Sequence, residues 1–255
     1  MSRLALRGVA LGYVAALIVL PVGMVFYRTF EKGIGAAWDA VTTPPAQHAF
    51  YLTVVITLIA VPLNAVFGVL TALLLARGRF PGRRLLDAAV DLPFAVSPVI
   101  VGLALILVWG RSGWFHTTGV IFAVPGMVLA TIFVSLPFVV REVLPVLREE
   151  GTEQEQAATT LGAGGWAVFR RITLPTIRWG LAYGVVLATA RSLGEFGAVS
   201  AVSGKISGRT ETMTLFVEDR FQSFDYTGAY AASVVLALLA LATLGVMLLL
   251  QRRSG

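Results

Sequence analysis

The chain has 255 residues, of which 57% are apolar and only 13% are charged. Soluble domains carry roughly 25% charged residues, so a chain this apolar cannot cover its own surface with polar groups and is expected to lie partly in lipid. The net charge of +6 gives little support to nucleic-acid binding, because few basic residues cluster on any soluble-looking segment. The absence of cysteine excludes disulfides, thiolate metal sites and a cysteine nucleophile.

Long apolar stretches define the expected fold, an all-α membrane protein with six transmembrane helices. A spanning helix needs about 20 mostly apolar residues. The stretches that qualify are 9–30, 50–76, 85–109, 118–140, 180–203 and 228–250. The first follows Arg3 and Arg7 as in a signal peptide, but its apolar run is too long and no small-x-small cleavage site follows it. We therefore expect an uncleaved first span.

The basic residues predict the orientation of these spans, with both termini in the cytoplasm. Thirteen basic residues then lie on the inner side and six on the outer side, as the positive-inside rule requires. The inner set is Arg3, Arg7, Arg77, Arg79, Arg83, Arg84, Arg141, Arg148, Arg170, Arg171, Arg178, Arg252 and Arg253. The outer set is Arg28, Lys32, Arg111, Lys205, Arg209 and Arg220. This places residues 141–178 in the cytoplasm.

Catalytic residues and metal ligands are not expected in this chain. A phosphate-binding P-loop needs G-x-x-x-x-G-K-[ST], and after Lys205 the required Ser or Thr is replaced by Ile206. The two histidines, His48 and His116, fall in separate predicted outer loops and form no zinc motif.

Charged and proline residues within the apolar stretches have structural interpretations. Asp87 and Asp91 lie at the cytoplasmic start of the third stretch, and we interpret them as neutralising a first helical turn rather than as a protease pair. Prolines inside the stretches favour kinks, as in a bundle around a cavity or in ordinary membrane packing. They are Pro21, Pro62, Pro93, Pro98, Pro125 and Pro137.

The polar segment 152–175 stands out in the middle of the chain. Thr152 and Glu155 match a capping box, which predicts a short helix from about 153 to 161. Gly162 then supplies a natural stop, and a second short helix is expected from about 166 to 173. Such a helical corner could seat in a groove of another protein, or it could lie on anionic lipid.

The same segment resembles the EAA loop of bacterial ABC importer permeases, whose pattern is E-A-A-x-x-x-G, nine residues and I-x-L-P. One departure is that Gln156 occupies the glutamate position, with Glu155 just before it. The resemblance implies a coupling helix, between the fourth and fifth spans, that docks into a cleft of a separate ATPase subunit. The residues assigned to this coupling are Glu155, Gln156, Ala157, Ala158, Gly162, Ile172, Leu174 and Pro175.

Two charged residues lie inside the predicted fifth span, where charges are costly unless they are paired or face a polar cavity. Arg191 and Glu195 are four residues apart and should share a helix face. They form either a structural ion pair or part of a translocation pathway or gate. Ser192, Ser200 and Ser203 add hydroxyl donors suited to an oxyanion, although serines also permit close helix packing.

Three further stretches resemble the sulfate/molybdate branch of these permeases, most closely its sulfate/thiosulfate members. They are residues 190–204, 125–142 and 224–233. The resemblance implies the ABC type-1 permease fold, with an N-terminal helix and outer loop at 1–49, a permease core at 50–250 and a cytoplasmic tail at 251–255. It also implies a multi-pass protein of the inner or plasma membrane that works by alternating access.

The resemblance also implies partners. These are a second permease subunit of the T type, two ATPase subunits that bind ATP and Mg, an extracytoplasmic sulfate-binding protein, and sulfate or thiosulfate as substrate. No cofactor is expected in this chain itself. Lys205, Arg209 and Arg220 on an outer loop are candidates for docking the binding protein, or else belong to a solvated loop. The alternatives are a homodimeric molybdate or tungstate permease and, from another class, a stand-alone secondary transporter.

Overall fold

The computed structural model describes residues 3–115 and 119–254, and every regular element in these ranges is helical. The predicted loop position of His116 lies outside the described residues. The helices are α1 (Arg3–Val14), η1 (Ala15–Val19, a π-helical turn), α2 (Leu20–Phe30), α3 (Ile34–Val41), α4 (Pro44–Arg77), α5 (Arg83–Ala95), α6 (Pro98–Trp109), α7 (Val124–Glu149), α8 (Glu153–Thr160), α9 (Gly165–Val168), η2 (Phe169–Thr173, π-helical), α10 (Leu174–Leu193), α11 (Gly197–Val202), α12 (Met213–Gln222) and α13 (Tyr226–Ser254).

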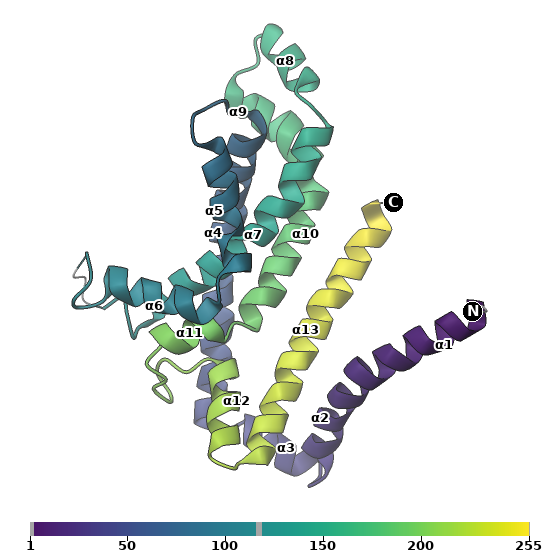
Figure 1. The fold of residues 1–255 in the computed structure, drawn as a ribbon, viewed down its shortest axis with the longest axis vertical. Coiled ribbons are helices and arrows are strands. Elements are labelled where there is room, and N and C mark those ends of the chain that lie inside the picture. The colour runs from purple at the N-terminus through teal and green to yellow at the C-terminus, as the bar shows by residue number, and fades with distance from the viewer. Residues whose placement is uncertain (1–2, 116–118, 255) are drawn as a thin grey trace.

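The centre of the protein is a bundle of α4, α7 and α10, which run side by side (Figure 1). Glycines allow these helices to approach closely. A Cβ atom on Gly68 of α4 would lie 2.7 Å from Val139 Cγ1 of α7, and one on Gly184 of α10 would lie 2.9 Å from Val139 Cα. Small residues at helix contacts are typical of membrane bundles, where packing rather than hydrophobicity drives association. Buried Val, Leu, Ile and Ala side chains from these helices form the core cluster around them.

Helix lengths and hydropathy identify four helices that could cross a membrane: Arg7–Phe30, Pro44–Arg77, Val124–Glu149 and Tyr226–Leu250. The predicted third span, 85–109, is not one straight helix. It breaks into α5 and α6, which are bent by 116° relative to each other. The reason is local, since Pro98 disfavours helical geometry at the preceding Ser97, which has φ −57° and ψ 133°.

The predicted fifth span, 180–203, is also divided. Helix α10 ends at Leu193, and α11 begins at Gly197. Helix α10 is continuous with η2 and α9, so the expected second short helix at 166–173 is the beginning of α10 rather than a separate element. The fourth stretch was expected to end at 140, whereas α7 continues to Glu149.

The prolines differ in their structural effects. Pro62, Pro93 and Pro137 lie inside helices, as the kink prediction assumed. Pro98 and Pro125 instead occupy first helical turns, where a proline removes no helical hydrogen bond.

The two terminal helices diverge from the central bundle (Figure 1). Helix α2 contacts α13 and α3, whereas the window of most apolar residues within Arg7–Phe30 has no buried residue. Helix α13 begins beside α12, α3 and α2, and its later part exposes Leu244, Leu248 and Leu249. It stays helical to Ser254, past the expected tail boundary at 250.

Candidate coupling and translocation sites

The corner after α8 has the geometry that the sequence predicted. Gly162 has a φ of +87°, in the left-handed region that glycine adopts at low cost. Its N–H donates to the Thr159 carbonyl at 3.0 Å, and the N–H of Ala163 donates to the Ala158 carbonyl at 3.0 Å. This pair of bonds is a Schellman motif, which satisfies the last carbonyls of a helix. The prediction that Gly162 ends this helix is therefore confirmed.

The predicted capping box at the start of α8 is wrong. Thr152 is the N-cap residue but makes no side-chain capping bond. Its hydroxyl instead accepts a hydrogen bond from Gln156 Nε2 at 3.0 Å. The Glu155 side chain does not return to the Thr152 backbone, because it has a stronger partner in the guanidinium of Arg77.

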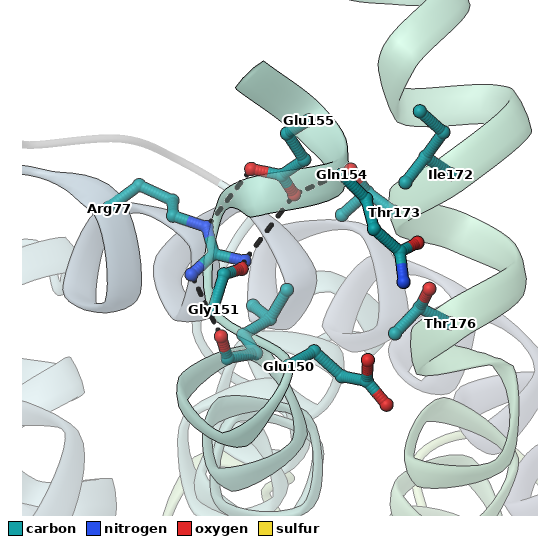
Figure 2. Close-up of a pocket in the computed structure, with 9 residues that line it drawn as sticks. Arg77, Glu150, Gly151, Gln154, Glu155, Ile172, Thr173 and Thr176 are labelled. Carbon is teal, nitrogen blue, oxygen red and sulfur yellow. Dashed lines mark hydrogen bonds and ion pairs between the residues drawn. The ribbon is translucent and has the colours of Figure 1, made fainter. Parts of the chain in front are cut away.

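Arg77, the last residue of α4, contacts three neighbouring segments (Figure 2). Its Nε lies 3.2 Å from Glu155 Oε2 in α8, and Nη1 donates to the Leu147 carbonyl of α7 at 2.8 Å. Its Nη2 donates to the Gly151 carbonyl in the turn between α7 and α8. The sequence analysis missed this role, since Arg77 was one of many basic residues at the inner ends of predicted spans.

Glu155 continues this network into α10. Its Oε1 atom accepts a hydrogen bond from the Thr173 hydroxyl at 2.9 Å (Figure 2). The side chains of Arg77 and Glu155 are 23% and 21% exposed, so both are largely enclosed. The carboxylate therefore faces the protein interior and is not free on the surface.

Other residues of the α7–α10 connection face outward. Gln156, Ala157 and Pro175 are exposed, whereas Ala158, Ile172 and Leu174 are partly buried. Two large apolar side chains are the most exposed part of the corner, Leu161 at 88% and Trp166 at 73%. Exposed apolar side chains grouped on a polar loop indicate a contact surface for another molecule. The sequence analysis did not single out Leu161.

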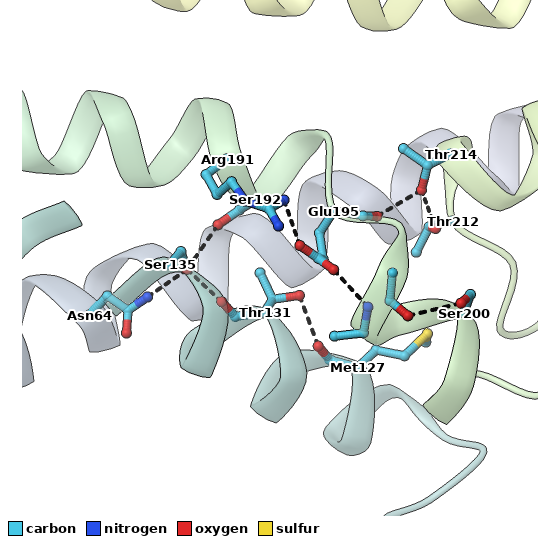
Figure 3. Close-up of polar contacts among 12 residues, drawn as sticks. Asn64, Met127, Thr131, Ser135, Arg191, Ser192, Glu195, Ser200, Thr212 and Thr214 are labelled. Carbon is cyan, nitrogen blue, oxygen red and sulfur yellow. Dashed lines mark hydrogen bonds and ion pairs between the residues drawn. The ribbon is translucent and has the colours of Figure 1, made fainter. Parts of the chain in front are cut away.

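Hydroxyl and amide groups form a buried network in the centre of the bundle (Figure 3). Asn64 Nδ2 of α4 donates to Ser135 Oγ of α7 at 2.7 Å and to the Ile132 carbonyl at 3.2 Å. Ser192 Oγ of α10 donates to the same Ser135 Oγ at 3.3 Å. Three helices are thus joined by side-chain hydrogen bonds, which satisfy polar groups that have no access to water.

The ion pair of Arg191 and Glu195 is formed, with 2.5 Å between Nη1 and Oε2 (Figure 3). The predicted shared helix face is wrong, because α10 ends at Leu193 and Glu195 lies in the break before α11. Glu195 is 2% exposed at its side chain and Arg191 is 29% exposed. The free oxygen of Glu195 is also used, since its Oε1 accepts the Ala198 N–H at 2.8 Å and so caps α11.

The predicted serine donors do not converge on one point. Ser192 belongs to the central network, whereas Ser200 donates to the Gly197 carbonyl at 2.9 Å and Ser203 accepts from the Lys205 N–H at 3.1 Å. A cavity of ≈ 10 Å³ lies between Ser192 and Glu195. A space of this size holds about one water molecule, so no oxyanion fits there in this conformation.

The three basic residues of the predicted docking loop differ in their availability. Lys205 forms an ion pair with Glu218 at 2.7 Å. Arg220 lies 4.7 Å from the centre of the Phe216 ring and 3.9 Å from Asp225. Arg209 is exposed, and no ion pair is found for it within the described part of the chain. Its charge is therefore the most accessible to a partner.

Glu211 is a buried acid in the same loop that the sequence analysis did not single out. It is 3% exposed, and burial raises the pKa of its carboxyl group above the ordinary value of 4.5. A hydrogen bond from the Ser207 side chain opposes this rise.

An all-helical membrane bundle with a helical corner at one end is the architecture of a membrane transport permease. Residues 64–255 match the family described as binding-protein-dependent transport system inner membrane component, and the chain belongs to this family. A "Sulfate transport system permease protein CysW" of Synechocystis sp. is 50% identical, over 98% of this chain and 93% of the relative. The protein of the same description from Escherichia coli is 46% identical, over 97% of this chain and 87% of the relative.

A third relative is more distant. The "Sulfate transport system permease protein CysT" of Escherichia coli is 40% identical, over 90% of this chain and 86% of the relative. Among solved structures, a bacterial ABC transporter for import of the polysaccharide alginate aligns with a TM-score of 0.78, over 98% of this chain and 93% of that chain. The two sequences are 17% identical, so this likeness concerns the fold, the ABC type-1 permease fold.

Proposed function

We propose that this chain is the membrane-spanning permease subunit of an ATP-driven sulfate/thiosulfate importer. The observation that carries the proposal is the 46–50% identity to relatives described as CysW over nearly the whole chain. Identity to the relative described as CysT is lower, at 40%. This difference favours the W position in a heterodimer whose other permease is of the T type, and it speaks against a homodimeric molybdate permease.

Coupling to a separate ATPase is assigned to the corner formed by α8, Gly162 and α9. The Schellman motif fixes the direction of α8, and Leu161 and Trp166 present exposed apolar surface at that end of the molecule. In this proposal two ATPase subunits bind ATP and Mg and move the corner. Gln156, Ala157 and Pro175 contribute exposed surface to the docking face, whereas Glu155 acts from inside.

The membrane arrangement follows from the helices. Six spans result if α5 and α6 together form one crossing and α10 another, in addition to the four long apolar helices. The end that carries the corner also carries Arg77 and the exposed Arg79, Arg170 and Arg171. The positive-inside rule places that end, and with it both termini, in the cytoplasm of an inner or plasma membrane.

Arg191 and Glu195 act in this conformation as a structural pair. Glu195 is nearly inaccessible, and its backbone carbonyl also accepts a hydrogen bond from the Thr214 hydroxyl at 2.8 Å. The pair thus joins the end of α10 to the beginnings of α11 and α12. A role in the pathway requires a different conformation, in which the partly exposed Arg191 faces an opened passage beside Ser192.

The outer loop is proposed as the docking site for the extracytoplasmic sulfate-binding protein. Arg209 is the most available of its three predicted cations, because Lys205 and Arg220 have acidic neighbours in this chain. An Arg209→Gln substitution should therefore weaken docking more than Lys205→Gln.

Sulfate-dependent growth tests this function. Cells that lack their own W-type permease but retain the T-type permease, the ATPase and the binding protein are supplied with this chain. We expect restored sulfate uptake, which excess thiosulfate inhibits and equimolar molybdate does not. Restored uptake in cells that also lack the ATPase would contradict the proposal and favour a stand-alone transporter.

A further inference from the structure

We propose that Arg77 is a positioning residue that ties the coupling corner to the end of α4, so that movement of the corner is passed to the membrane bundle. This inference rests on the proposed function, because it assumes that the corner is where the ATPase acts. It goes beyond that function in naming the connection through which the push travels.

The contacts of Arg77 are directed to the segments that must move together. Its guanidinium reaches the Leu147 carbonyl in the last turn of α7, the Gly151 carbonyl in the following turn, and the Glu155 carboxylate in α8. Both carbonyls belong to a helix end, where the last four carbonyls lack helical partners. The positive charge also suits the negative end of the α7 dipole.

Glu155 extends the same connection to α10. It lies in the first turn of α8, where a negative charge is favourable, and it accepts the Thr173 hydroxyl at 2.9 Å. The ion pair therefore links four segments, α4, α7, α8 and the start of α10. Helix α8 itself has no buried residue, so hydrophobic packing does not hold it in place. Polar contacts of this kind are what fix its position.

The enclosure of the pair strengthens the argument. The space beside the two side chains, bordered by Gln154, Ile172 and Thr176, is a cavity of only ≈ 20 Å³ (Figure 2). Ion pairs are screened much less when they are partly buried than when they lie on the surface. Hydrogen bonds from a charged group are also roughly twice as strong as neutral ones.

Only arginine can make this set of contacts. The guanidinium presents donors in a fixed planar fork, so one side chain can serve acceptors in three directions. A lysine has a single charged nitrogen and would retain the attraction to Glu155 but lose at least one carbonyl. The two residues are 78 positions apart in the sequence, and the carboxylate they share with Thr173 is not available to a cation of the ATPase.

The test separates transmission from assembly. The complex with the T-type permease and the ATPase is purified and reconstituted in proteoliposomes, and two quantities are measured: the amount of ATPase that co-purifies, and the sulfate imported per ATP hydrolysed. Arg77→Gln should retain ATPase association, because the exposed docking face is unchanged. It should lower sulfate imported per ATP by about tenfold, since one charge-assisted hydrogen bond shifts an equilibrium by about that factor.

Matched variants make the result specific. Arg79→Gln removes an exposed arginine two positions away and should leave the ratio unchanged, whereas Arg77→Lys should fall between wild type and Arg77→Gln. A wild-type ratio in Arg77→Gln, or an equal loss in Arg79→Gln, would overturn the inference. If Arg77→Gln does not assemble, Glu155→Gln decides, because a lowered ratio supports the connection and a wild-type ratio overturns it. A wild-type complex that imports no sulfate would instead refute the proposed function.

Discussion

Replacement of Gly162 by valine should uncouple the corner from the ATPase without affecting insertion into the membrane. An added Cβ atom would meet no atom within 4 Å, so steric overlap contributes nothing to the cost. The cost lies in the backbone, because Gly162 has a φ of +87°. A left-handed conformation costs an L-residue roughly 1–2 kcal/mol, and it is least tolerated by β-branched side chains.

This magnitude is enough to alter the corner. A cost of one or two kcal/mol changes an equilibrium by a factor of about 5–30. Helix α8 buries no residue that could offset it. We therefore expect Gly162→Val to reduce both ATPase co-purification and sulfate uptake severalfold at an unchanged level of membrane protein. Gly162→Ala should have a smaller effect of the same kind.

Gly164 provides the matched control. It lies in the same corner with a φ of −70°, a value that any residue adopts, and it also has no atom within 4 Å of an added Cβ. Gly164→Val should therefore retain uptake. Unchanged uptake in Gly162→Val would refute the coupling role of the corner, and equal losses in both variants would show that bulk rather than backbone geometry is responsible.

Other predictions address topology, the buried ion pair and pH. A periplasmic reporter fused near residue 160 should be inactive and one fused near residue 215 active, and the reverse pattern would overturn the orientation. Arg191→Ala and Glu195→Ala should each destabilise the folded protein by up to about 3–5 kcal/mol, and Arg191→Met/Glu195→Leu should recover most of this loss, measured by thermal unfolding. Arg191→Ala should be the worse single change, since it strands the more buried carboxylate; sulfate uptake that stays absent in the refolded double variant would assign the pair to the pathway. Because the pKa of Glu211 is raised on folding, stability should decline as pH rises above about 4.5, and Glu211→Gln should remove this part of the pH dependence.

The sequence predicted the helical bundle well, but it did not predict where helices break. Apolar stretches of about 20 residues locate helices reliably, since the bilayer sets their length. The break at Ser97 and Pro98 had a visible signal, because proline restricts the residue before it, yet composition continued unchanged across it. The break before α11 depends on Glu195, whose carboxylate caps the new helix. Its spacing from Arg191 fitted a continuous helix equally well.

The candidate sites show the same limit. Gly162 could be identified because a helix stop is a local property of a few residues. The partner of Glu155 could not, because Arg77 lies 78 positions away and contacts at that distance depend on how α4 and α8 are packed together. The capping-box prediction failed for the same reason, since a tertiary ion pair replaced a local hydrogen bond.

The most direct test of the account is sulfate transport by the purified complex. The chain is reconstituted in proteoliposomes with the T-type permease and the ATPase, with ATP on the ATPase side and radiolabelled sulfate and the binding protein on the other. We predict sulfate uptake that requires ATP, the ATPase and the binding protein together. Uptake by the permeases alone, driven by an ion gradient in the absence of ATP, would contradict the central claim.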